Sequence, residues 1–199
     1  MVFILDEVMT SRLSPGGAAS LYGIKPDIKT FGKYLGGGMA FGAFGGREAI
    51  MRLYDPRVAG YLAHSGTFNN NTMVLYAGHT GLAKVFTPDV CVEFNKMGSS
   101  FREKLAAVTR GTRLSFTGVG TIMCSHFTES GAQEIRNRDD VQEIPTLQDL
   151  FWYEMLEDGF WIVRRGTIAL ILGTPQAELD RFVACVAGFV ERHRDILAL

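Results

Sequence analysis

The sequence predicts an α/β fold over residues 1–110, followed by a small α+β unit over residues 111–199. Up to about residue 110, segments with the pattern of short strands alternate with helical segments. Beyond that point the pattern changes to closely spaced strand segments followed by helices. Glycine is concentrated between Gly16 and Gly46, so its excess belongs to one region and is not spread as low complexity.

The first expected element is a strand at residues 2–5, a continuous apolar run that ends in two acids. Such a run is typical of a parallel strand buried on both faces. A loop rich in Ser, Pro and Gly follows it, and Pro26-Asp27 then turns the chain into a second strand. The other elements expected here are a short helix near residues 18–22, strands at 28–31 and 41–45, and a helix at 48–54.

Two longer helices complete the first part. One is expected over residues 72–86, capped by Asn71, because an Asn side chain accepts hydrogen bonds from the free amides of a first turn. The next starts near Thr87-Pro88, where Pro suits the first helical position, and runs to about residue 108. In the second part we expect strands at 113–116, 121–127, 160–163 and 168–172, a loop at 129–143, and helices at 146–158 and 176–194.

Composition and charge disfavour several kinds of partner. With 20 basic and 21 acidic side chains, the formal net charge is −1, so no general positive field is available to hold DNA or RNA. Three cysteines without a CxxC pair indicate neither a zinc site nor a disulfide framework, and favour a reducing compartment such as the cytoplasm. No apolar run approaches the roughly 20 residues of a membrane span. We therefore expect neither nucleic acid, metal nor membrane as a partner.

Two charged residues stand where open α/β sheets place functional groups, just beyond strands. Asp6 ends the first expected strand. Lys33 follows the second, between Gly32 and a triple glycine, where nearly bare backbone would let a bulky ligand approach closely. Taken alone, Asp6 is a capping or turn residue and Lys33 a solvated loop lysine. Together they suit pyridoxal 5'-phosphate (PLP), which needs an amine that forms a Schiff base with its aldehyde and an acid that keeps its pyridine nitrogen protonated.

Five motifs follow one another along the first half of the chain: Asp6-Glu7-Val8-Met9-Thr10, Lys25-Pro26-Asp27, Thr30-Phe31-Gly32-Lys33-Tyr34-Leu35-Gly36-Gly37-Gly38, Gly42-Ala43-Phe44-Gly45-Gly46-Arg47 and His64-Ser65-Gly66-Thr67-Phe68. In this order and spacing they resemble the class III aminotransferases, and most closely the branch of glutamate-1-semialdehyde aminomutases. The resemblance is specific over most of residues 2–110 and looser in the remainder. A glycine run by itself would carry almost no information.

The resemblance implies a fold-type I PLP-dependent transferase. Residues 1–110 would form the C-terminal part of its PLP-binding large domain, a mixed and mostly parallel sheet with helices. Residues 111–199 would form its small C-terminal α+β domain. The implied activity is amino-group transfer on a small-molecule amino donor or acceptor, either between two molecules, as in a transaminase, or within one, as in an aminomutase.

The resemblance also implies roles for four residues. Lys33 matches the Schiff-base lysine, which also moves the proton between substrate carbons. Asp6 matches the partner of the pyridine nitrogen, and Val8 matches the residue that packs against the face of the ring. Thr67 matches a threonine that contacts the cofactor phosphate from the other subunit, which implies a homodimer with shared active sites.

The chain departs from its relatives in two respects. Where many of them have Ser-Gly-Asn-Pro, it has Asn69-Asn70-Asn71-Thr72; because Asn tolerates a left-handed backbone, we expect the turn to be kept. In addition, the family's phosphate-binding loop and the aromatic residue stacked on the ring both come before the strand that opens this chain. We therefore expect a fragment or truncated product that is incomplete as a catalyst, or a chain that a separate N-terminal chain completes.

Two other functions remain open from the sequence. One is a non-catalytic remnant or scaffold with the shape of its relatives. The other is a nucleotide-binding α/β module, which is weaker because Gly36-Gly37-Gly38 does not fit GxGxxG. The amino substrate is not readable: Arg164 or Arg165 could hold a carboxylate with two parallel hydrogen bonds, but paired arginines are more typical of a solvated surface.

Overall fold

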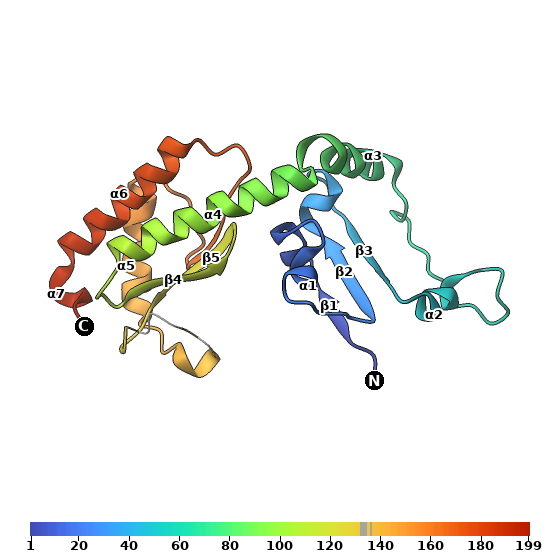
Figure 1. The fold of residues 1–199 in the computed structure, drawn as a ribbon, viewed down its shortest axis with the longest axis horizontal. Helices are drawn as coiled ribbons and strands as arrows, with labels where there is room; N and C mark the ends of the chain where they lie inside the picture. Colours follow the sequence, from blue (N-terminus) through green and yellow to red (C-terminus); the bar gives the residue numbers. More distant parts are fainter. Residues whose placement is uncertain (132–134, 136) are drawn as a thin grey trace. The chain divides into compact units, whose positions relative to one another are not determined.

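The structure, a computed structural model, describes residues 1–131, 135 and 137–199. The described chain divides into two compact units, Met1–Glu93 and Phe94–Leu199. The chain passes from one unit to the next within the long helix α4, Pro88–Val108 (Figure 1). This division falls between Glu93 and Phe94, inside α4, whereas the sequence analysis expected the boundary near residue 110, just beyond the end of that helix.

A three-stranded mixed sheet forms the centre of the first unit, in the order β1-β2-β3. Strand β1, Ile4–Asp6, runs parallel to β2, Ile28–Gly32, with Asp6 opposite Thr30. Strand β3, Gly42–Gly46, runs antiparallel to β2. Because β1 and β2 are parallel neighbours, their carboxyl ends meet at the same edge of the sheet.

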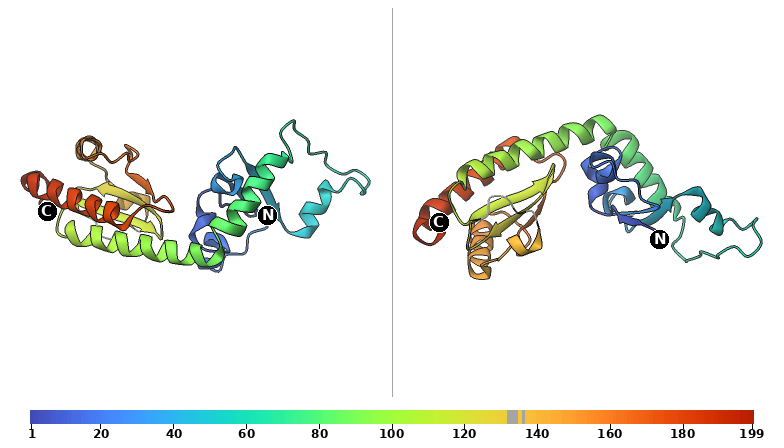
Figure 2. Two further views of the ribbon diagram at one scale, coloured as in Figure 1. Left: turned by 90° about the horizontal axis from the view of Figure 1, so that it is seen from above. Right: turned by 60° about the horizontal axis from the view of Figure 1, so that its bottom comes forward.

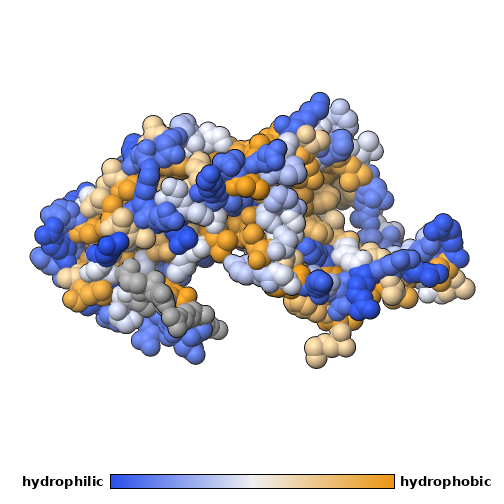
Figure 3. All heavy atoms as spheres, viewed as in Figure 1, coloured by the Kyte–Doolittle hydropathy of each residue, from blue (hydrophilic) through white to orange (hydrophobic). Residues whose placement is uncertain are grey.

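Strand β1 is not buried on both faces, and that expectation was wrong for this chain. Its apolar residues stay largely open to solvent: Ile4 is 57% exposed and the preceding Phe3 is 47% exposed. The reason is its place in the sheet, since β1 is an edge strand and pairs with β2 alone among the described strands. Figure 3 shows hydrophobic residues at the surface of both units.

The helices of the first unit begin and end close to the expected positions. They are α1, Gly17–Leu21; α2, Glu48–Met51, extended by a 3-10 turn at Arg52–Tyr54; and α3, Thr72–Thr80, which continues as a π-helical segment at Gly81–Val85. The Asn71 cap of α3 is confirmed, because its side-chain oxygen accepts from the amides of Met73 and Val74 at 3.1 and 3.2 Å. Thr87 accepts from the amide of Val90 at the start of α4.

The second unit packs helices against an antiparallel sheet in the order β4-β5-β6. Its strands are β4, Leu114–Val119, β5, Ile122–Phe127, and β6, Thr167–Ala169; its helices are α5, Pro145–Glu157, α6, Gln176–Arg192, and α7, Arg194–Leu197. Three fully buried phenylalanines form its centre, with ring centroids 5.1 to 6.1 Å apart: Phe127, Phe151 and Phe189. These edge-to-face and tilted contacts add to the burial of apolar area.

One expected strand is absent from this unit. Residues 160–163 have no strand structure, and β6 pairs with β5 instead. Two side-chain contacts hold this segment: Phe160 packs edge-on against Phe182, with centroids 4.9 Å apart, and the indole of Trp152 donates to the carbonyl of Ile162 at 3.0 Å. The carbonyl of Ile162 therefore has a side-chain partner where a ladder would supply a backbone amide. The loop expected at 129–143 includes a 3-10 turn at Arg138–Asp140, and four of its residues, 132–134 and 136, lie outside the described residues.

Candidate active site

Asp6 is the last residue of β1, and its carboxylate is oriented by two hydrogen bonds. Its Oδ1 atom accepts from the backbone amide of Val8 at 2.9 Å and from the hydroxyl of Thr30 at 3.0 Å. These two donors, Val8 first, lower the pKa of Asp6 below its usual value, and the positive charge of Lys33 contributes in the same direction. Asp6 is therefore held as a carboxylate while it remains exposed to solvent.

Lys33 directly follows Gly32, the last residue of β2, and is also exposed. Its backbone has a φ of +54°, in the left-handed region that residues with a side chain rarely adopt. Such strain costs roughly 1–3 kcal/mol and gathers at functional sites. The parallel register of β1 and β2 places both residues at one edge of the sheet.

Val8 lies in a turn beyond β1 and not within the strand as expected from its spacing to Asp6. It still faces the site, because a Cβ built on Gly32 would lie 3.4 Å from Cγ1 of Val8. The same Cβ would lie 3.2 Å from the carbonyl oxygen of Phe41. Gly32 thus leaves little spare space, and the isopropyl group of Val8 lies against the residue before Lys33.

Glu7 is a buried acid that the sequence reasoning did not single out. Its carboxylate accepts from the amides of Ala18 and Ala19, both at 2.9 Å, and from the hydroxyl of Thr10 at 3.1 Å. Lys29 lies 3.5 Å away on the same side. Since successive side chains point to opposite sides of a strand, Glu7 holds one side of the turn while Asp6 faces the other.

The pKa of Glu7 reflects a balance between burial and these partners. Burial, the largest single effect, raises the pKa, but the lowering partners, led by the amides of Ala19 and Ala18, together outweigh it, so the pKa is lowered. The hydroxyl of Thr10 and the charge of Lys29 add to the lowering. In the sequence, Glu7 stands out only as a second acid directly after Asp6. Nothing in that pattern tells a buried acid from a solvated one.

Two residues of the triple glycine, Gly36 and Gly37, serve packing, where the sequence suggested the close approach of a ligand; a Cβ on Gly38 would meet nothing within 4 Å. A Cβ on Gly37 would lie 2.5 Å from the backbone of Ala77 in α3, and one on Gly36 would lie 2.5 Å from the side chain of Phe41. From the other side, a Cβ on Gly78 would lie 2.2 Å from the carbonyl oxygen of Leu35. These glycines therefore let α3 pack directly on the segment that follows Lys33.

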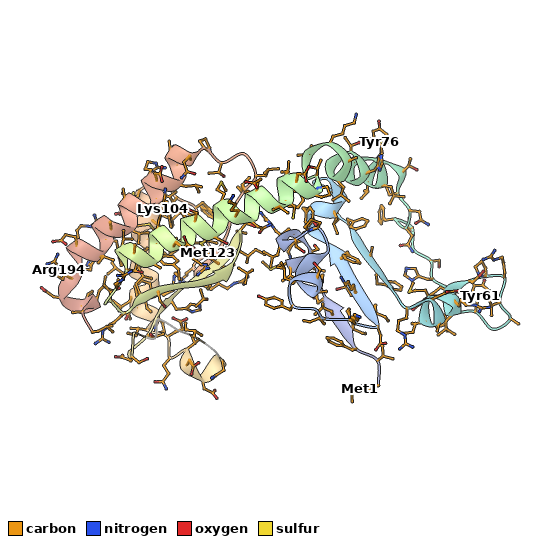
Figure 4. All side chains as sticks on the ribbon, viewed as in Figure 1. Met1, Tyr61, Tyr76, Lys104, Met123 and Arg194 are labelled. Carbon is orange, nitrogen blue, oxygen red and sulfur yellow. The ribbon has the colours of Figure 1, made fainter. Side chains whose placement is uncertain are left out.

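Thr67 is exposed, in the segment that connects α2 to α3. This segment extends away from the sheet in all three ribbon views (Figures 1 and 2), and Figure 4 labels Tyr61 within it and Tyr76 on α3. Among the described residues, no hydrogen bond or ion pair joins Thr67 to Asp6 or Lys33. Asn70 adopts a φ of +57°, so the left-handed turn expected for the three asparagines is present.

A hollow of about 1120 Å³ lies between β3, the connecting segment and α3. Phe44 of β3 forms part of its wall, with the ring of His64 edge-on at 5.4 Å and Tyr54 beside both. Neither Asp6 nor Lys33 lines it. Two candidates remain, Arg164 and Arg165, both in the second unit. The guanidinium of Arg164 is already engaged, because it donates twice to Asp149, both at 2.6 Å. Arg165 is exposed, and its Nε donates to the hydroxyl of Thr167 at 3.4 Å.

Two kinds of feature are absent among the described residues. No group of three His, Cys, Asp or Glu side chains is placed to hold a metal ion. No described helix combines the length and the apolar character that crossing a bilayer demands.

Comparison with known proteins gives a consistent result. A family model described as aminotransferase class-III matches residues 1–177. An uncharacterized aminotransferase of Schizosaccharomyces pombe is 48% identical over 199 residues, covering 100% of this chain and 45% of that protein. A glutamate-1-semialdehyde 2,1-aminomutase of Akkermansia muciniphila is 32% identical over 93% of this chain and 44% of its own length.

Among solved structures, the chain is similar to a β-phenylalanine aminotransferase of Variovorax paradoxus, with a TM-score of 0.93 and 42% identity. That match covers 99% of this chain and 46% of the solved chain. This chain thus spans a little under half the length of the relatives it matches.

Proposed function

The chain belongs to the class III aminotransferases, a family whose cofactor is PLP, and on this premise we propose that it supplies the catalytic lysine of a PLP-dependent amino-group transfer. In this proposal the amine of Lys33 forms the Schiff base with the cofactor, and the carboxylate of Asp6 accepts a hydrogen bond from the protonated ring nitrogen. Because the chain belongs to this family, we no longer consider the nucleotide-binding module that the sequence had left open. The observation that carries the proposal is the register of β1 and β2. These parallel neighbours end at the same edge of the sheet, β1 at the ionised carboxylate of Asp6 and β2 just before Lys33.

The residues at this edge fit the chemistry of the cofactor. When bound, PLP supplies an aldehyde that condenses with amines and a ring that takes up electrons from the substrate. A pyridine N–H needs an anionic acceptor, and Asp6 presents one whose Oδ1 is occupied and whose Oδ2 has no hydrogen bond to a described residue. An aldehyde needs a primary amine, which Lys33 provides.

Each of the four proposed site residues then has a specific task. Asp6 remains ionised and holds the proton on the ring nitrogen. With the cofactor and substrate bound, Lys33 Nζ would accept and return the proton that moves between substrate carbons. Val8 packs against one face of the ring, and Thr67 reaches the cofactor phosphate bound in a second copy of the chain. Exposure of Thr67 supports this last role, which makes the functional form a homodimer.

We place the reaction among transaminases in preference to aminomutases, with small amino compounds as donors and keto compounds as acceptors. The 48% and 42% identical relatives are both named aminotransferases, whereas the aminomutase is 32% identical. β-Phenylalanine, named in the 42% identical relative, is the first donor to test. A requirement for a separate keto acceptor supports a transaminase; conversion of an amino aldehyde without one supports the aminomutase.

Reductive trapping tests the central assignment. The folded chain is incubated with PLP, reduced with borohydride and mapped by mass spectrometry, alongside Lys33→Ala and the control Lys25→Ala. We expect one adduct at Lys33 in the unmodified chain and in Lys25→Ala, and none in Lys33→Ala. A folded chain without an adduct, or adducts spread over several lysines, would contradict the proposal and leave the scaffold alternative in its place.

A further inference from the structure

We propose that Thr30 is a positioning residue for the cofactor's acid: its hydroxyl holds Oδ1 of Asp6 so that Oδ2 alone faces the ring nitrogen. This inference rests on the proposed function, and it assigns a role to a strand residue for which packing and strand propensity offer no reason to prefer a hydroxyl. Thr30 makes this contact without being expected to touch cofactor or substrate.

The geometry restricts the carboxylate to one orientation. Both protein donors, the amide of Val8 and the hydroxyl of Thr30, converge on the same oxygen of Asp6, at 2.9 and 3.0 Å. Because Oδ1 is engaged twice, exchanging the two oxygens by rotation would break two hydrogen bonds together. Among the described residues, no hydrogen bond is made to Oδ2. One oxygen is thus anchored to the fold and the other is left for a ligand.

The two donors constrain Asp6 from different parts of the fold. Val8 belongs to the turn after β1, while Thr30 lies in β2, directly opposite Asp6 in the parallel register. A turn donor alone would let the carboxylate move with the turn. The donor from β2 ties the carboxylate to the strand that ends just before Lys33.

The side chain of Thr30 is suited to this task. A branched Cβ restricts rotation about χ1, which limits the directions in which the hydroxyl can point. Valine has the same shape and the same preference for strands, so shape and propensity alone do not explain threonine at this position. Hydrogen bonds to an ionised acceptor are roughly twice as strong as neutral ones, which makes the hydroxyl the informative group.

The effect of the Thr30 hydroxyl on Asp6 can be separated from the effect of the charges around Asp6. Lys33 is the cation that acts on Asp6, and the adjacent acid, Glu7, is held by the amides of α1 on the other side of the turn, with Lys29 beside it. Removing the hydroxyl of Thr30 leaves these charges in place. A change in Asp6 after this substitution can therefore be assigned to the lost hydrogen bond.

The test compares Thr30→Val, which keeps the shape, with Thr30→Ser, which keeps the hydroxyl. The control Thr117→Val removes a hydroxyl that bonds His126 at 2.9 Å across two strands of the other unit. The first measurement is the pKa of the Asp6 carboxyl, which is obtained from a carbon-13 NMR titration of the full chain without cofactor. The second is the dissociation constant for PLP and the pH dependence of the visible absorbance of bound PLP.

We expect Thr30→Val to raise the pKa of Asp6 and to weaken PLP binding about tenfold, the effect of one hydrogen bond to a charged group. Thr30→Ser should restore most of both properties, and Thr117→Val should leave both unchanged. An Asp6 pKa in Thr30→Val equal to that of the unmodified chain overturns the proposal, as does a serine variant that behaves like valine.

Failure of the proposed function has a different signature. In that case PLP leaves no adduct on Lys33 of the unmodified chain, and the NMR titration still decides whether Thr30 holds Asp6. If the adduct forms but Thr30→Val binds PLP as tightly as the unmodified chain, the positioning role is overturned while the function stands.

Discussion

The carboxylate of Glu7 occupies the place where a side chain of residue 17 would stand. A Cβ on Gly17 would lie 2.5 Å from Oε2 of Glu7, and the backbone there has a φ of +74°. A glycine is therefore required at this position for two independent reasons, and the first prediction uses both.

Gly17→Ala should lower the free energy of unfolding by about 3 kcal/mol, because a left-handed backbone and a steric conflict with a buried carboxylate act together. Gly23→Ala is the matched control: its φ is +64°, but nothing lies within 4 Å of the added carbon. It should cost only about 1 kcal/mol. Urea unfolding followed by circular dichroism measures both, and equal losses would show that the carboxylate of Glu7 yields to the new methyl group.

Replacing Glu7 should make stability less dependent on pH. Its pKa is lowered in the folded chain, so its contribution is complete above the ordinary value of 4.5 and is lost as the pH falls through the folded value. At neutral pH, Glu7→Gln should cost about 2 kcal/mol, because an amide nitrogen would replace one acceptor oxygen. The difference from the unmodified chain should shrink on acidification. The exposed Glu103→Gln serves as control, and a constant difference for Glu7→Gln from pH 7 to pH 3 would refute the assignment.

The strained backbone at Lys33 predicts an unusual order of stability. Glycine adopts a left-handed φ freely, so Lys33→Gly should be more stable than Lys33→Ala by about 1 kcal/mol. At Lys25, whose φ is not positive, the same pair should show the opposite order. Thermal unfolding of the four variants tests this. If alanine is the more stable replacement at both positions, the strain at residue 33 is absent in solution.

The cap of α3 should be worth about 1 kcal/mol, since the side chain of Asn71 satisfies two free amides of the first turn. Asn71→Ala should lose this amount, and Asn71→Asp should retain most of it. Asn69→Ala, two residues earlier and outside the cap, is the control. Amide hydrogen exchange at Met73 and Val74 locates the effect, and unchanged protection there in Asn71→Ala would contradict the assigned cap.

Local signals in the sequence were sufficient for much of the fold. The cap at Asn71, the start of α4 near Thr87 and the left-handed turn at Asn70 each depend on a few consecutive residues. The expected strands at residues 2–5 and 28–31 likewise placed Asp6 and Lys33 at strand ends, and the register of β1 and β2 agrees with that prediction.

The remainder depended on contacts between distant residues. Residues 160–163 have the composition of a strand, yet Trp152 and Phe182 hold that segment through side chains. The triple glycine suggested room for a ligand, but Gly37 and Gly78 are required by the approach of α3. Burial of Glu7 follows from the position of α1, which no pattern around residue 7 reveals.

Strand β1 joins an apolar face to an outer row of backbone amides and carbonyls that pairs with no other described strand. In water, such a strand is a template on which another extended segment can add, gaining backbone hydrogen bonds as it covers Phe3 and Ile4. Aggregation of this polypeptide should therefore increase with its concentration. A charged residue in place of Ile4 should suppress this aggregation.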